Sequence, residues 1–142
     1  MTPTLFGRIQ TRLVLLATLG VVWTLIVGPF LPADGELSDV YGMALRALAV
    51  TAILGTVLWE PLYHALQQLR WEKDWPTALG LVTGIPEGFL VWALVFAGEM
   101  DGVTATTFWI HFGTTWVLLW FAANGPMQIV FLRWRYRGGR VW

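Results

Sequence analysis

The sequence predicts an all-α integral membrane protein whose four helices form a bundle. Three observations predict this class: 56% of the 142 residues are hydrophobic, the mean hydropathy is +0.61, and four long apolar runs are separated by short charged intervals. A helix needs about 20 apolar residues to cross the hydrocarbon core of a bilayer, and each run is long enough. The runs do not alternate as the strands of a membrane barrel do.

The four predicted helices lie at about 9–31, 41–69, 76–98 and 105–134. The first run is uncharged between Arg12 and Asp34. Residues 47–69 of the second contain a single charge, Glu60, the third contains only Glu87, and the fourth is uncharged up to Arg133. No low-complexity linker divides the chain, so residues 1–142 are predicted to form one transmembrane domain.

The charged residues predict an orientation. The first and third loops carry acidic residues and neither Lys nor Arg. Eight of the nine basic residues fall on the other side of the predicted membrane: Arg8, Arg12, Arg70, Lys73, Arg133, Arg135, Arg137 and Arg140. By the positive-inside rule both termini are cytoplasmic. The preference for Arg over Lys indicates a GC-rich bacterial genome, and therefore a bacterial inner membrane.

The C-terminal segment mixes basic and aromatic residues, as RNA-binding tails also do. Beside a membrane span, the same composition is a topology determinant that attracts anionic lipid head groups. We therefore expect lipid contacts, and no nucleic-acid binding, at Arg133, Arg135, Arg137 and Arg140.

Glu87 is the strongest candidate for a functional residue, because it lies near the centre of the third run. A carboxylate at this depth must be protonated, paired or exposed to water. Pro86 removes a backbone donor beside it and loosens the helix. Two interpretations remain open: a proton or cation site, or a protonated acid that hydrogen-bonds a neighbouring helix as a packing contact.

A second candidate site consists of Glu60 and His64, which are four residues apart on one face of the second helix. Such a pair can relay a proton or contribute to a metal site, with a third group such as Asn124 or Gln128 from the fourth helix. Two ligands on one helix do not make a metal site. A structural hydrogen-bonded pair is the interpretation that we prefer, so no bound metal is predicted.

Glycines at Gly80, Gly84 and Gly88 form a repeated GxxxG pattern on the third helix. Small residues at this spacing allow membrane helices to approach closely. The pattern is compatible with homodimerisation and with packing inside the bundle, and we favour packing inside the bundle.

Sequence motifs give no sign of an enzyme or of a bound cofactor. The chain has no Cys, no phosphate-binding glycine loop, no HExxH and no GxSxG. Its two histidines, His64 and His111, are predicted near opposite faces of the membrane, too far apart to share one haem.

These observations predict an accessory or scaffold subunit of a larger membrane complex, bound to other membrane subunits or to itself. The ten tryptophans support this, because Trp59, Trp116 and Trp120 lie deep and are expected to pack inside the protein or against a partner. The alternative is a small proton- or cation-coupled transporter or channel centred on Glu87.

Overall fold

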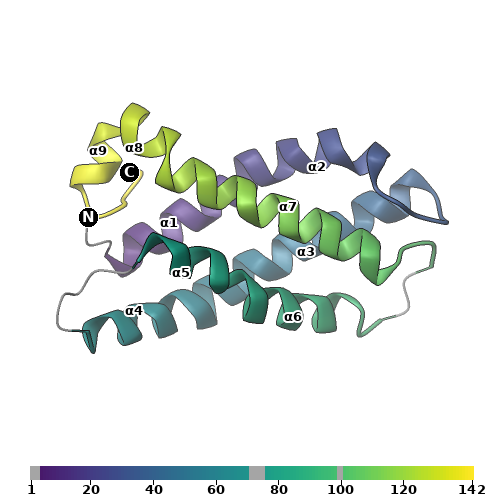
Figure 1. Cartoon of the computed structure of the whole chain (residues 1–142), viewed down its shortest axis with the longest axis horizontal. Helices are drawn as coiled ribbons and strands as arrows, with labels where there is room; N and C mark the ends of the chain where they lie inside the picture. The colour runs from purple at the N-terminus through teal and green to yellow at the C-terminus, as the bar shows by residue number, and fades with distance from the viewer. Residues whose placement is uncertain (1–3, 71–75, 99–100) are drawn as a thin grey trace.

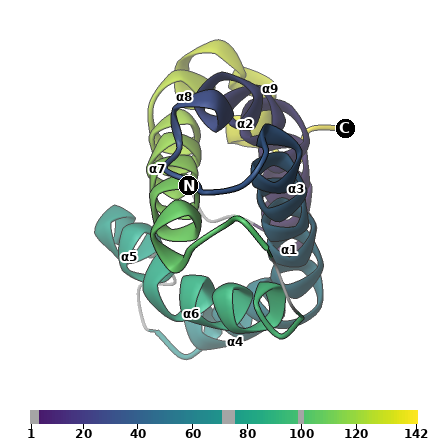
Figure 2. The ribbon, with the colours of Figure 1, turned by 90° about the vertical axis from the view of Figure 1, so that its right-hand side faces the viewer.

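A computed structural model of the chain describes residues 4–70, 76–98 and 101–142. Within these ranges the protein is all-α, with four long helical segments packed lengthwise and a short helix at the C-terminal end (Figure 1). Both chain ends lie at one end of the bundle. Viewed end-on, the segments surround a common axis (Figure 2).

The first segment runs from Leu5 to Phe30 and is not uniformly α-helical. It consists of α1 (Leu5–Leu15), a π-helical turn (Leu16–Gly20), α2 (Val21–Val27) and a 3₁₀ turn (Gly28–Phe30). The Thr4 hydroxyl caps α1 by accepting a hydrogen bond from the Gly7 amide (3.1 Å).

The second segment, Leu37–Gln68, contains α3 (Leu37–Leu54), a π-helical turn (Gly55–Trp59) and α4 (Glu60–Gln68). A capping box formed by Glu36 and Asp39 starts α3. Because Pro61 has no amide hydrogen, the helical ladder is interrupted where the π turn meets α4. Such turns redirect the side chains that follow them, and they recur at functional sites.

The third segment breaks at Thr83 into α5 (Thr77–Val82) and α6 (Gly84–Val95). The fourth segment is α7 (Ala105–Asn124), which ends at Gly125 and is followed by α8 (Pro126–Val130) and α9 (Leu132–Tyr136). The prediction of one helix over 105–134 was therefore wrong. Gly125 adopts a non-helical conformation (φ −116°, ψ −96°), and Pro126 starts a new helix there.

Hydrophobic residues lie on both the inside and the outside of the bundle. Met43, Ala47, Val91 and Phe108 form the core between α3, α6 and α7. Large apolar side chains also face outward, including Ile53 at 62% exposure. In the described part of the chain, three helices are long and apolar enough to cross a membrane, Leu5–Phe30, Leu37–Gln68 and Thr77–Val95. The protein is therefore a multi-pass membrane protein by length and composition.

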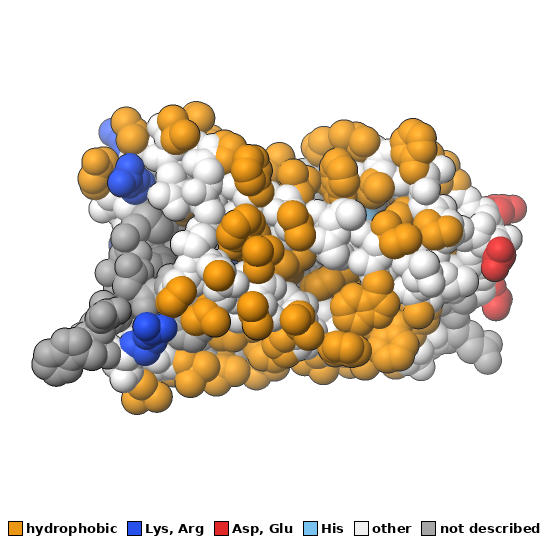
Figure 3. Space-filling view, in the orientation of Figure 1, with side chains coloured by type: hydrophobic (Ala, Val, Ile, Leu, Met, Phe, Trp, Pro, Cys, Tyr) orange, Lys and Arg blue, Asp and Glu red, His pale blue; other side chains and the backbone are white. Residues whose placement is uncertain are grey.

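The two ends of the bundle carry opposite charge (Figure 3). Exposed Asp34, Glu36 and Asp101 occupy the loops at one end. The exposed arginines of the C-terminal segment occupy the other, which we call the basic end. Lys73 and Glu99, which also entered the predicted orientation, lie outside the described residues.

Candidate functional site

Two arginines of α1 and the two acids of the apolar runs form one buried ion-pair network. Arg8 donates from Nε to Glu60 Oε2 (2.6 Å), and Arg12 donates from Nε to Glu60 Oε1 (2.8 Å). Arg12 also donates two hydrogen bonds to Glu87, from Nη1 to Oε2 (2.5 Å) and from Nη2 to Oε1 (3.1 Å). The network thus joins α1, α4 and α6, with two positive charges facing two negative ones.

The charged side chains of the network are almost fully buried. The side chain of Glu87 is 1% exposed and that of Arg12 is 12% exposed. An unpaired charge in such surroundings is strongly unfavourable, whereas a bidentate arginine–carboxylate pair supplies both charge and hydrogen bonds. Arg12 also lies over the ring of Trp116, with its Cζ 5.6 Å from the ring centroid.

Local structure on the second segment explains how Glu60 and Arg12 meet. Gly55, in the π turn, leaves room for the Arg12 side chain, since a Cβ there would lie 2.8 Å from Arg12 Nε. The turn is followed by α4, whose Glu60, Tyr63 and Gln67 share the buried face. Gln67 Oε1 accepts a hydrogen bond from Arg8 Nη1 (3.3 Å) and extends the network toward the basic end.

Of the three possibilities open to Glu87, the structure shows a paired carboxylate, and its partner is Arg12. Arg12 was assigned to the cytoplasmic boundary because the first helix was expected to begin at about residue 9. The helix begins at Leu5, so Arg12 lies two turns inside it. The detectable signal was the spacing of Arg8 and Arg12, which places both on one face of the helix.

The predicted pairing of Glu60 with His64 does not form. Both oxygens of Glu60 accept hydrogen bonds from guanidinium groups, and hydrogen bonds between charged partners are the strong ones. His64 is half-buried, and its Nδ1 has no hydrogen-bond partner among the described residues. Within the described chain, no three His, Cys, Asp or Glu side chains cluster closely enough to hold a metal ion.

Asn124 does not complete a site with Glu60 and His64. It is exposed at the end of α7, and its Nδ2 donates to the Trp120 carbonyl one turn earlier (2.8 Å). His111 lies away from the network, with Nε2 2.8 Å from the Thr24 hydroxyl. The partner of His111 is thus a buried threonine of α2.

The glycine seam of the third segment faces α7 of the same chain. A Cβ at Gly88 would lie 2.7 Å from Phe112, one at Gly84 would overlap the Trp116 indole, and one at Gly80 would touch Trp120. The indole nitrogens of Trp116 and Trp120 donate to the carbonyls of Gly80 (3.1 Å) and Thr77 (2.9 Å). Each glycine thus accommodates an aromatic ring of the neighbouring helix.

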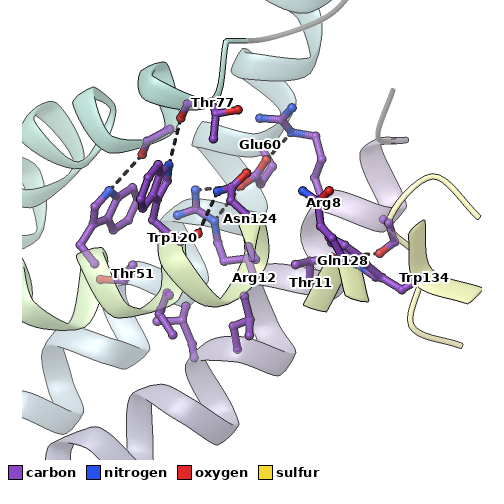
Figure 4. A pocket seen from close by; sticks show the side chains of 18 of the residues that line it. Arg8, Thr11, Arg12, Thr51, Glu60, Thr77, Trp120, Asn124, Gln128 and Trp134 are labelled. Atoms are coloured by element: carbon purple, nitrogen blue, oxygen red, sulfur yellow. Dashed lines mark hydrogen bonds and ion pairs between the residues drawn. The ribbon is translucent and has the colours of Figure 1, made fainter. Parts of the chain in front are cut away.

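An open cavity of about 630 Å³ adjoins the network at the basic end (Figure 4). Side chains from α1, α4, α5, α7, α8 and α9 line it. Arg8, Arg12 and Glu60 line it, together with Trp120, Asn124 and Gln128. The ion-pair network therefore borders a space large enough for a small molecule.

Comparisons of the chain with protein-family models, with curated proteins and with solved structures found no match.

Proposed function

We propose that the protein is a non-catalytic accessory subunit of a larger complex in a bacterial inner membrane, with four spans and both termini in the cytoplasm. The observation that carries this proposal is Arg46. Its side chain is exposed on α3, and it makes no ion pair with any described residue, including Asp39 and Asp101. A cation on a membrane-facing helix surface favours a carboxylate of a neighbouring subunit.

The surroundings of Arg46 support a protein neighbour. The side chains of Leu45 and Ile53, on the same helix, are 49% and 62% exposed. They form an apolar face around one charge, a composition suited to a partner helix that carries one acid. The interior supports a static role, because both intramembrane acids are already neutralised by Arg8 and Arg12.

Isolation of the tagged protein from its own membrane in mild detergent tests the proposal. Wild-type protein is expected to bring membrane subunits with it, and Arg46→Leu is expected to lose them, whereas Arg46→Lys retains them. Arg140→Leu, at an exposed arginine of the C-terminal segment, is the matched control and should retain the partners. A wild-type protein that migrates as a lone monomer, with no co-purifying chain, contradicts the proposal.

A second candidate function is proton- or cation-coupled transport centred on Glu87. It is favoured by the cavity, which brings open space up to Arg12 and Glu60, the groups linked to Glu87. Opening of the Arg12–Glu87 pair would give a carboxylate at mid-helix access to that space. Equal transport by wild type and Glu87→Gln in proteoliposomes would remove this candidate.

The exposed arginines of the C-terminal segment are proposed to contact anionic lipid head groups. Arg133, Arg135, Arg137 and Arg140 form no ion pair with a described residue. Each such residue near an anionic membrane surface contributes roughly 1 kcal/mol of attraction.

A further inference from the structure

We propose that the cavity at the basic end binds the phosphodiester head group of an anionic phospholipid, with Arg70 and Arg8 as its anion-binding residues. The proposal concerns a site inside the bundle. It is separate from the exposed C-terminal arginines and does not depend on the accessory role.

Charge is the first argument. Arg8, Arg12, Arg70 and Glu60 line the cavity, and Arg12 is also bound to Glu87. Among the residues that the structure describes, three guanidinium groups therefore face two carboxylates, which leaves one positive charge in excess. That charge borders a partly enclosed space, where an anion is held more strongly than at an open surface.

Unused hydrogen-bond donors are the second argument. All three nitrogens of Arg12 are engaged by Glu60 and Glu87. Arg8 uses Nε and Nη1, and its Nη2 has no acceptor among the described residues. Arg70 makes no side-chain hydrogen bond or ion pair with any residue that the structure describes. Free guanidinium nitrogens match phosphate oxygens in geometry and charge.

The distribution of polar and apolar walls is the third argument. Near the basic end the cavity is lined by Thr77, Asn124 and Gln128, which offer hydroxyl and amide groups to a glycerol or phosphate (Figure 4). Deeper along α1 and α7 the lining becomes apolar, with Leu16 and Leu119. A ligand that matches both parts has an anionic head and a hydrocarbon chain, which is the chemistry of a phospholipid.

The volume is compatible with this occupant. At about 630 Å³ the cavity falls within the usual range for small-molecule sites, roughly 300–1,000 Å³. It accommodates a head group and the first part of one acyl chain, while the remainder of the lipid stays in the bilayer. Free inorganic phosphate shares the anionic chemistry but would leave the apolar part of the cavity empty.

Native mass spectrometry of the full chain in detergent tests the proposal, with phosphatidylglycerol and phosphatidylcholine of identical acyl chains as probes. Wild type is expected to retain phosphatidylglycerol about tenfold more strongly than phosphatidylcholine. Arg70→Gln should lose this preference, because it removes the free cation and leaves the Arg12 network intact. Arg46→Gln, at an exposed arginine of α3 that does not line the cavity, is the matched control and should keep it.

A second pair of variants tests the cavity without changing charge. Ala123 lines the cavity, so Ala123→Phe is expected to reduce retention of both lipids, whereas Ala93→Phe on the exposed face of α6 should not. Equal retention of the two lipids by wild type overturns the proposal. A preference that survives Arg70→Gln but disappears in Arg137→Gln also overturns it, by moving the contact to the C-terminal surface. Displacement of phosphatidylglycerol by millimolar inorganic phosphate assigns the site to the free anion instead.

Discussion

Arg12 is the residue at which three membrane helices meet, since it extends from α1 to Glu60 of α4 and Glu87 of α6. Arg12→Leu is expected to destabilise the protein by about 3–5 kcal/mol, because it leaves Glu87 buried without its cation. Adding Glu87→Leu to Arg12→Leu should recover much of this loss, since the buried charge is then absent. Thermal unfolding in detergent, followed by circular dichroism, measures both effects as a double-mutant cycle.

The double-mutant cycle also tests whether Arg12 and Glu87 interact or contribute independently to stability. If the double variant unfolds at the temperature expected from adding the two single losses, Arg12 and Glu87 do not interact as the structure describes. Arg12→Lys provides a milder comparison, because an ammonium group cannot bind two carboxylates in the bidentate manner of a guanidinium.

Sequence reasoning identified the acids of this network more readily than the arginines. Glu60 and Glu87 are conspicuous because each is the single charge within an apolar run. Arg12 lies at the edge of such a run, where the same sequence also suits an interfacial topology residue. Only the start of α1 at Leu5 and the space left by Gly55 place its side chain inside. Both features depend on three-dimensional packing, which the periodicity of apolar residues in the sequence does not reveal.

At the scale of elements, the contact between α6 and α7 rests on glycines that accommodate aromatic rings. Gly84→Ala is expected to destabilise the protein by about 1–3 kcal/mol, because the added methyl overlaps the Trp116 indole. Gly113 on α7 is a matched control, since a Cβ there meets nothing within 4 Å. Gly113→Ala should be neutral or slightly stabilising, through the better helix propensity of alanine. Equal unfolding temperatures for the two variants would contradict this contact.

The C-terminal segment is held against α1 by a close backbone approach. The Thr4 amide donates to the Gly138 carbonyl (2.8 Å), and the Thr11 hydroxyl donates to that of Gly139 (2.9 Å). A side chain at Gly7 would overlap the Gly138 carbonyl. Gly138 and Gly139 have positive φ angles (63° and 86°), which glycine adopts without strain.

Gly7→Val should therefore release the C-terminal segment while leaving the helices of the bundle in place. Trypsin cleavage after the C-terminal arginines, followed by mass spectrometry in detergent, is expected to be faster in this variant than in wild type. Gly42→Ala, where a Cβ has open space, serves as the control. Unchanged cleavage in Gly7→Val would show that this docking does not protect the segment.

At the scale of the whole molecule, mean hydropathy underestimates how well α7 suits a membrane span, because the mean is taken over both faces of the helix. Its polar residues Thr107, His111 and Thr115 are buried, whereas Val117 and Phe121 are exposed at 54% and 58%. These three polar side chains lower the mean hydropathy of α7 although they do not face the outside of the bundle. Length and charge predicted the existence of this segment, but its break at Gly125 depends on a local conformation that an apolar pattern does not reveal.

This inward placement of polar groups leads to a prediction about topology. If α7 crosses the membrane with the other three segments, the termini share one side, as their position at one end of the bundle requires (Figure 1). The positive-inside rule predicts that this side is the cytoplasm. Green fluorescent protein fused after Trp142 should therefore fluoresce in bacterial cells, and alkaline phosphatase at that position should be inactive. Alkaline phosphatase fused after Gly98, in the acidic third loop, should be active. Active phosphatase at both Gly98 and Trp142 would mean that α7 does not span the bilayer, whereas activity at Trp142 alone would mean that the bundle has the opposite orientation.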